Sequence, residues 1–171
     1  MNRKRPYHHG NLKPALLRAA TELIAEVGPA AFALREVARR AGISHNAPYR
    51  HFRDKDELLA SVATEGFERL AGALSEAACR EGKRANGRDQ APRRLQASGV
   101  GYVKFALQWP EHLLVMFDWP LPMKRCPEVA EAGERAFGVL VKLIEERRRK
   151  AACRRAIRCY RRTLRGRWFT A

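Results

Sequence analysis

Apolar residues recur along this chain at the three-and-four spacing of amphipathic helices, and no segment shows the alternation of a strand. The first helical pattern is predicted to begin near Asn11, a good cap residue, and to end at Gly28-Pro29. Its apolar face consists of Leu16, Leu17, Ala20, Leu23, Ile24 and Val27. The pattern of the whole chain predicts an all-α fold.

Residues 33–58 predict two short helices and the start of a third. The first should end at Gly42, where a left-handed residue would cap it, and a tight turn follows. Pro48 limits where the second helix begins, because proline is tolerated only in the first turn. We expect the second helix to carry Tyr49 and Phe52 inward and to leave the neighbouring polar residues outside. Such a pair is a helix-turn-helix, the arrangement that many DNA-binding proteins use.

Asp54 can cap the third helix, with Glu57 three residues later and an apolar run from Leu58. The apolar positions continue to about residue 79, which predicts a long connecting helix. Residues 80–94 carry almost no apolar side chain and are predicted to form a loop or linker.

The second half of the chain predicts further helices separated by prolines. A helix is expected from about residue 93 to Trp109, and Pro110 should open a short helix over residues 111–117. Residues 118–122 are predicted to be a rigid non-helical connection, because their prolines disfavour helix at the preceding residues. A long helix should then start at Pro127.

The run Leu-Arg-Glu-Val-Ala-Arg-Arg-Ala-Gly-Ile-Ser, followed by Pro-Tyr-Arg-His-Phe-Arg-Asp-Lys-Asp-Glu-Leu, resembles the N-terminal domain of TetR/AcrR-type transcriptional regulators. The similarity covers roughly residues 7–62, and residues 101–117 are more loosely similar to the regulatory domain of one branch of that family. Ala33 departs from the pattern, since family members often carry a capping Ser or Thr there. The resemblance implies an N-terminal helix-turn-helix head, a connecting helix and a helical regulatory and dimerisation domain.

The resemblance also implies a function, a sequence-specific repressor that a small-molecule effector releases from DNA. Its expected partners are double-stranded DNA with an inverted-repeat operator, an unidentified effector and a second copy of the chain. The predicted domains are residues 1–57 (the DNA-binding head with a basic arm), 58–146 (the ligand-binding and dimerisation domain) and 147–171 (an arginine-rich tail).

Specific DNA binding needs phosphate contacts that fix register and base contacts that read sequence. By their position in the family motif, Tyr49 and His51 resemble phosphate-binding residues, and Lys55 lies in a helix first turn that would face the DNA backbone. The remaining candidates are Arg35, which could reach phosphate or base, and Ser44, His45, Asn46 and Arg50 near the second helix. For each of them a solvated surface side chain is the alternative interpretation.

An aromatic and sulfur-bearing set in the second half is the candidate lining of an effector cavity. It consists of Tyr102, Phe105, Trp109, Met116, Phe117 and Trp119. Ordinary core packing is the favoured alternative, because no polar residue of the sequence points to a ligand type.

The chain carries a net charge of +16, and 11 of its 34 basic residues lie after Glu146 with no acid among them. This tail either forms a basic helix with one apolar stripe or is foreign to the rest of the chain, as a shifted reading frame would give; its charge density favours the second interpretation. It also raises an alternative function, non-specific nucleic-acid binding driven by the tail.

Several classes of protein are disfavoured by what the sequence lacks. It contains no nucleophile elbow, phosphate-binding glycine loop or dinucleotide fingerprint, so an enzyme is not expected, nor is a cofactor. Its four cysteines have no metal-binding or disulfide spacing, so no metal site is predicted. Without an apolar run long enough for a bilayer or a signal peptide, the chain is expected to be cytoplasmic and to make no membrane contact.

Overall fold

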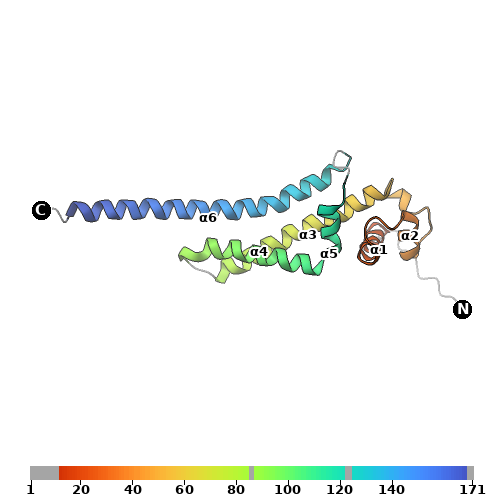
Figure 1. Cartoon of the computed structure of the whole chain (residues 1–171), viewed down its shortest axis with the longest axis horizontal. Coiled ribbons are helices and arrows are strands. Elements are labelled where there is room, and N and C mark those ends of the chain that lie inside the picture. The colour runs from red at the N-terminus through yellow and green to blue at the C-terminus, as the bar shows by residue number, and fades with distance from the viewer. Residues whose placement is uncertain (1–11, 85–86, 122–124, 169–171) are drawn as a thin grey trace. The chain divides into compact units, whose positions relative to one another are not determined.

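The computed structural model describes residues 12–84, 87–121 and 125–168, with only the backbone described for residue 88 and from residue 153 onward. The described residues form helices without a strand, which confirms the predicted all-α fold (Figure 1). The chain divides into two compact units. The first comprises the residues up to Arg69 together with Phe105–Gly133, and the second comprises Leu70–Lys104 with the residues from Glu134 onward. The predicted division into residues 1–57, 58–146 and 147–171 remains a prediction.

The first unit begins with α1 (Leu12–Val27) and α2 (Leu34–Arg40), which pack against each other. Both helices end as predicted, at glycines in the left-handed region, with φ of +80° at Gly28 and +68° at Gly42. Their small core is formed by Leu16, Leu23, Ile24, Val37 and Phe52, each at most 2% exposed.

The second helix of the pair is only a 3₁₀ turn, η2 (Pro48–Arg50), preceded by a turn from Ser44 to Ala47. Phe52 is buried as predicted, but the prediction for Tyr49 is wrong, since its side chain is 50% exposed. The reason is the spacing of the buried residues: Pro48 and Phe52 lie four apart and share the inner face. Tyr49 follows Pro48 directly, so its side chain points away from this inner face and into solvent. Val27, at the last turn of α1, is also exposed rather than part of the apolar face.

The helix α3 (Lys55–Arg84) starts where the sequence predicts, because the Asp54 carboxylate accepts the backbone N–H of Glu57 at 2.9 Å. Glu57 reaches back and accepts the backbone N–H of Arg53 at 2.7 Å. The predicted loop over residues 80–94 is wrong: α3 continues to Arg84, and α4 (Gln90–Gln108) begins soon after the 3₁₀ turn η3 (Gly87–Asp89). Charged residues such as those of this segment are good helix formers, so low apolarity alone did not mark a loop.

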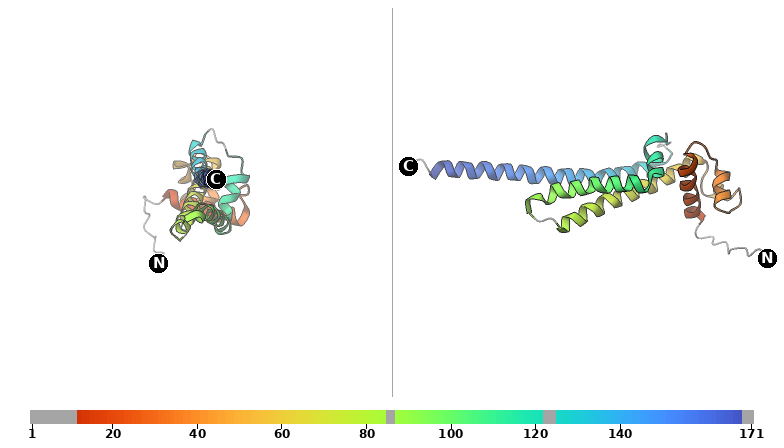
Figure 2. Two further views of the ribbon diagram at one scale, coloured as in Figure 1. Left: turned by 90° about the vertical axis from the view of Figure 1, so that its left-hand side faces the viewer. Right: turned by 60° about the horizontal axis from the view of Figure 1, so that its bottom comes forward.

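In the second unit α3 and α4 run side by side (Figure 2). A β-carbon at Gly101 would lie 2.9 Å from the carbonyl oxygen of Ala73 and 3.0 Å from the β-carbon of Ala77, so only glycine allows this approach. An ion pair between Arg94 and Glu146 at 2.6 Å joins α4 to the last helix. These contacts fix α4 between two neighbours.

Two short elements, α5 (Pro110–Leu113) and the π-helical turn η4 (Leu114–Asp118), confirm the short helix predicted after Trp109. Trp119 then has extended backbone, as expected before a proline. Gly66 of α3 lets α5 and η4 come close, because a β-carbon there would lie 2.5 Å from the sulfur of Met116 and 3.2 Å from the β-carbon of His112.

The last helix, α6 (Pro127–Trp168), starts at the predicted proline and is continuous (Figure 2). It buries Val129, Ala132, Ala136 and Leu143, whereas Phe137 is 66% exposed. The helical backbone extends into the arginine-rich tail as far as Trp168. The apolar stripe predicted for that tail falls on side chains outside the described residues.

Candidate nucleic-acid interface

The residues predicted to contact DNA come from four consecutive segments: α2, the turn after Gly42, η2 with the residue that follows it, and the first turn of α3. All but one of them are exposed; the exposed set is Arg35, Ser44, His45, Asn46, Tyr49, Arg50 and His51. Apart from the ring of His51, which lies near that of Phe52, their side chains make no hydrogen bond or ion pair with any described residue. They are therefore available to a ligand.

The segment that carries these side chains is held by its backbone and by three buried residues. The N–H groups of His51 and Phe52 both donate to the carbonyl of Pro48 at 2.9 Å, and the N–H of Ala47 donates to that of Ser44 at 3.0 Å. Ala47, Pro48 and Phe52 are buried beneath the exposed set. The backbone that carries these polar side chains is therefore held in place, as a base-recognition surface requires.

An ion pair fixes α2 on α1. The guanidinium of Arg40 donates to both carboxylate oxygens of Glu26, at 2.6 and 2.5 Å, and a second acid, Glu22, lies at 3.8 Å. The hydrogen bond from Arg40 lowers the pKa of Glu26, so this pair stays ionised well below neutral pH. The backbone of Arg35, on the first turn of the same helix, is thereby placed relative to α1.

Lys55 differs from the other candidates because its side chain is engaged within the protein. Its Nζ donates to the carbonyl of Ala30 at 2.8 Å and lies 4.7 Å from the ring centre of Phe32 and 5.3 Å from that of Trp119. Burial lowers the pKa of Lys55. The ammonium group has three N–H donors, so Lys55 can still donate to a phosphate while it holds the Ala30 carbonyl.

Arg125 contributes to the start of α3 in a way that the sequence did not indicate. Its guanidinium lies 3.0 Å from a carboxylate oxygen of Asp54 and 3.6 Å from one of Asp56. The pKa of Asp54 is lowered, first by the backbone N–H of Glu57 that it accepts and also by Arg125. Because 71 residues separate Asp54 from Arg125, no local pattern could have revealed this contact.

Comparison with known proteins gives one family. Residues 16–62 match the family model of bacterial regulatory proteins of the tetR family. A stretch of 60 residues is 43% identical to the HTH-type transcriptional repressor Rv3405c of Mycobacterium tuberculosis, which covers 35% of this chain and 32% of that protein. The solved structure of a protein with unknown function from Rhodococcus sp. RHA1 is 36% identical, with a TM-score of 0.69 over 84% of this chain and 71% of the other. A bacterial regulatory protein in the tetR family from Rhodococcus RHA1 shares the fold, with 24% identity and a TM-score of 0.63 over 78% of this chain and 67% of the other.

The N-terminal region of this chain, residues 16–62, belongs to the TetR family. The TetR family model covers most of α1, all of α2 and η2, and the first turns of α3. Every residue predicted to contact DNA lies within this matched region. The chain matches about a third of the length of the curated relatives.

The six residues predicted to line an effector cavity differ in exposure, and their role remains a prediction. Phe105 and Met116 are buried, Tyr102 and Phe117 are exposed, and Trp119 lies beside Lys55. Only Trp109 among them lines the cavity of about 790 Å³ between α1 and α3. Among the described residues there is no group of three or more His, Cys, Asp or Glu side chains suited to a metal ion, and no helix is long and apolar enough to cross a membrane.

Proposed function

We propose that this chain is a sequence-specific DNA-binding transcriptional repressor that a small-molecule effector releases from its operator. The observation that carries the proposal is the row of exposed polar side chains from Arg35 to His51 on a pinned helix-turn-helix. Non-specific attraction to DNA would not require a rigid surface of this kind.

Within this surface the side chains divide by chemistry. Asn46 and Arg50 are suited to base edges, because an amide pairs with adenine and a guanidinium with guanine in the major groove. His45 belongs with them. Tyr49 and His51 are assigned to phosphates, and the exposure of Tyr49 supports this role against that of a core aromatic.

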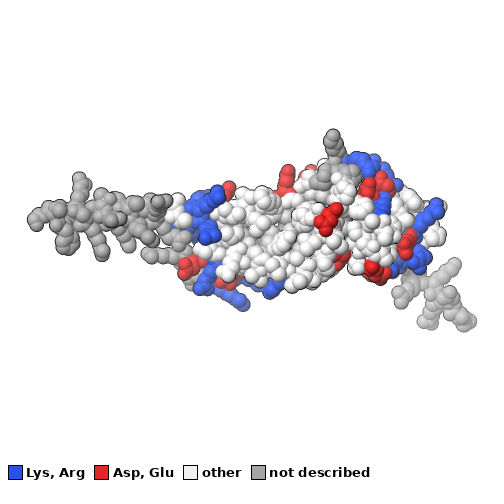
Figure 3. Space-filling view, viewed as in Figure 1, with Lys and Arg blue, Asp and Glu red and all other residues white. Residues whose placement is uncertain are grey.

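We propose that the protein binds an inverted repeat as a homodimer. In the second unit, α4 exposes Val100 and Val103 by 50% and 54%, and α6 exposes Phe137 by 66%. Figure 3 shows a wide surface without charged side chains over α4 on the face it presents. A second copy would cover these exposed apolar side chains, and its head would read the next major groove about 34–36 Å away.

The effector would act through α3, which begins beside the DNA-reading segment and continues into the second unit. A ligand that favours one packing of α3 changes the separation of the two heads in a dimer. Because both heads must meet grooves one turn apart, a small change in separation lowers affinity for the operator.

Genome-wide binding by the purified full chain tests the proposal. A sequence-specific repressor enriches a palindromic site, and the same chain bearing Asn46→Ala enriches it less. The alternative, non-specific binding by the arginine-rich tail, predicts no preferred site and the same steep salt dependence on every sequence. Enrichment without any palindrome would overturn the proposal.

A further inference from the structure

The start of α3 carries a run of charged residues, namely Arg53, Asp54, Lys55, Asp56 and Glu57. The first and last of them pair with each other, since Nε of Arg53 lies 3.2 Å from a carboxylate oxygen of Glu57. The ammonium of Lys55, the candidate phosphate contact, is flanked in the sequence by the two remaining carboxylates. Oppositely charged groups this close attract each other strongly, so either carboxylate can compete with DNA for the ammonium.

Within the described part of the chain, however, Lys55 forms an ion pair with neither of its neighbours. Its Nζ donates to the carbonyl of Ala30, which leaves two of its three N–H donors without a hydrogen bond to a described residue. The charge of Asp56 still reaches it, because burial lowers the pKa of Lys55 and Asp56 opposes that effect. Something must therefore keep the neighbouring carboxylates from pairing with Lys55.

One guanidinium from a distant part of the sequence holds both carboxylates. Nη1 of Arg125 lies 3.0 Å from Oδ2 of Asp54, and Nη2 lies 3.6 Å from Oδ2 of Asp56. The other oxygen of Asp54, Oδ1, accepts the backbone N–H of Glu57, so each oxygen of this carboxylate has its own partner. The residue after Arg125, Cys126, is 2% exposed, which ties the backbone at this point to the core.

The charges at the start of α3 balance only when Arg125 is counted. Residues 53–57 contribute three acids and two bases, and Arg125 adds the third base. Without it, Asp54 and Asp56 would have the ammonium of Lys55 as a partner within reach, since Arg53 is already paired with Glu57. A lysine held by a carboxylate has fewer donors and less net charge to offer a phosphate.

We propose that Arg125 is a positioning residue for DNA binding. By holding the carboxylates of Asp54 and Asp56, it leaves the ammonium of Lys55 able to donate to a phosphate. Arg125 acts through Lys55 and makes no contact with DNA itself. The inference rests on the proposed function, in which Lys55 contacts the DNA backbone. Arg125 lies outside residues 16–62, the region that matches the family model.

A double-mutant cycle between Arg125 and Lys55 tests this role in the full chain. Affinities are measured at physiological salt for the most enriched inverted repeat and for a scrambled duplex of the same length. Arg125→Gln is expected to weaken binding to both duplexes about three- to tenfold, part of the effect of losing one charge-assisted hydrogen bond. In the Lys55→Ala background the same change should cost less than about twofold, because the residue through which it acts is gone. An equal loss in both backgrounds would mean that Arg125 contacts DNA or acts by its charge alone, and overturns the proposal.

Two further variants separate this role from a change in total charge or in folding. Lys104→Gln removes an exposed base of α4 in the second unit and should weaken binding less than about twofold. Asp56→Asn removes one competing carboxylate and should raise affinity mainly when Arg125 is absent. The side chain of Arg125 is 51% exposed, so Arg125→Gln is expected to fold, as thermal unfolding will show. A loss in Lys104→Gln equal to that in Arg125→Gln, or an equal gain from Asp56→Asn with and without Arg125, contradicts the proposal.

The two duplexes keep this inference separate from the proposed function. If wild type shows no preference for the inverted repeat, sequence-specific repression is overturned, while the cycle on the scrambled duplex still measures the coupling of Arg125 to Lys55. If wild type prefers the inverted repeat and Arg125→Gln binds both duplexes as tightly as wild type, only the role of Arg125 is overturned.

Discussion

At the scale of single residues, the contacts of each side chain separate those available to DNA from those that the fold already uses. Asn46 and Arg50 are exposed, and their side chains make no hydrogen bond or ion pair with a described residue. Lys55 instead donates to a backbone carbonyl and lies over the ring of Phe32. The three residues lie close together in the sequence, and composition alone could not distinguish them.

Substitution of these residues should have different effects on DNA binding. Asn46→Ala and Arg50→Ala are each expected to cost about 1–3 kcal/mol, mostly on the preferred site. Lys55→Ala should weaken binding to all sequences alike and make the salt slope shallower by about one phosphate. Affinities measured over a range of salt concentrations on specific and scrambled duplexes check this. A change of site preference in Lys55→Ala would contradict the proposed orientation on DNA.

His112 should make the stability of the protein dependent on pH near neutrality. Its pKa in the folded state is lowered, so below its unfolded value of about 6.5 the unfolded chain binds more protons than the folded one. The stabilisation is therefore complete above that pH and is lost as the pH falls through it. The charges near the ring are Glu111, Glu65 and Arg69. Urea unfolding between pH 5 and 8 measures the slope, and a slope unchanged in His112→Phe would show that another group causes it.

At the scale of elements, helix ends were predictable because their chemistry is local. Gly28, Gly42, Asp54 and Pro127 each mark an end or a start that the structure confirms. Residues 80–94 were predicted to be a loop, but most of them are helical, since charged residues occur both in loops and on exposed helix surfaces. Boundaries that depend on capping were therefore read correctly, and one that depended on apolarity was not.

The cap of α3 can be tested with a pair of variants. Asp54→Ala removes the acceptor for the Glu57 N–H and should cost about 0.5–2 kcal/mol, whereas Asp54→Asn keeps an acceptor oxygen and should cost less. The pKa of Asp54 is lowered, so its stabilisation is present above about pH 4 and is lost as the pH falls further. Thermal unfolding at pH 7 and at pH 3.5 should show the two variants closer to wild type at the lower pH. Equal losses in both variants at pH 7 would contradict the capping role.

Two glycines of α4 give a matched test of how α3 and α4 pack. Gly101→Ala places a β-carbon 2.9 Å from the Ala73 carbonyl oxygen, and overpacking of this kind costs about 1–3 kcal/mol. Gly99→Ala meets nothing within 4 Å and should stabilise the helix by about 0.5–1 kcal/mol. Chemical denaturation of both variants measures the difference. If Gly101→Ala were as stable as Gly99→Ala, the close approach of the two helices would be wrong.

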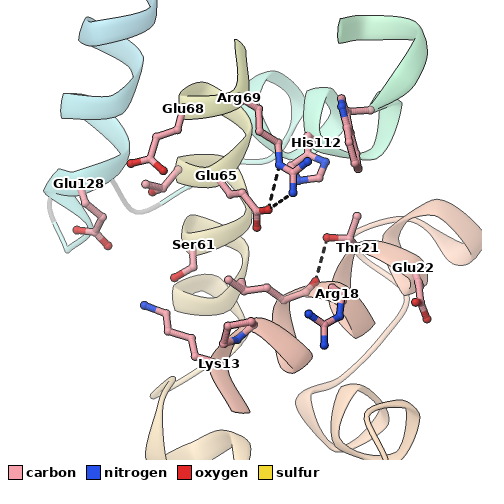
Figure 4. A pocket seen from close by; sticks show the side chains of 14 residues that line it. Lys13, Arg18, Thr21, Glu22, Ser61, Glu65, Glu68, Arg69, His112 and Glu128 are labelled. Atoms are coloured by element: carbon pink, nitrogen blue, oxygen red, sulfur yellow. Dashed lines mark hydrogen bonds and ion pairs between the residues drawn. The ribbon is translucent and has the colours of Figure 1, made fainter. Parts of the chain in front are cut away.

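At the scale of the whole molecule, the sequence was sufficient for the fold class and for the helix-turn-helix but not for contacts between distant residues. The helix-turn-helix could be predicted because its turn, its proline Pro48 and its buried aromatic Phe52 lie within a short stretch. The contact of Arg125 with Asp54 could not, nor could the cavity beside His112, which three separate helices and α5 assemble (Figure 4). The exposure of Tyr49 was also not predicted, because neighbouring positions in a helical turn can face the core or the solvent.

The central claim is that the head recognises one DNA sequence rather than DNA in general. Its most direct test is the ratio of affinities of the purified full chain for its most enriched inverted repeat and for a scrambled duplex of the same length, at physiological salt. The account predicts a preference for the inverted repeat of at least about 10³-fold. A ratio near one would show that charge alone drives binding and would contradict it.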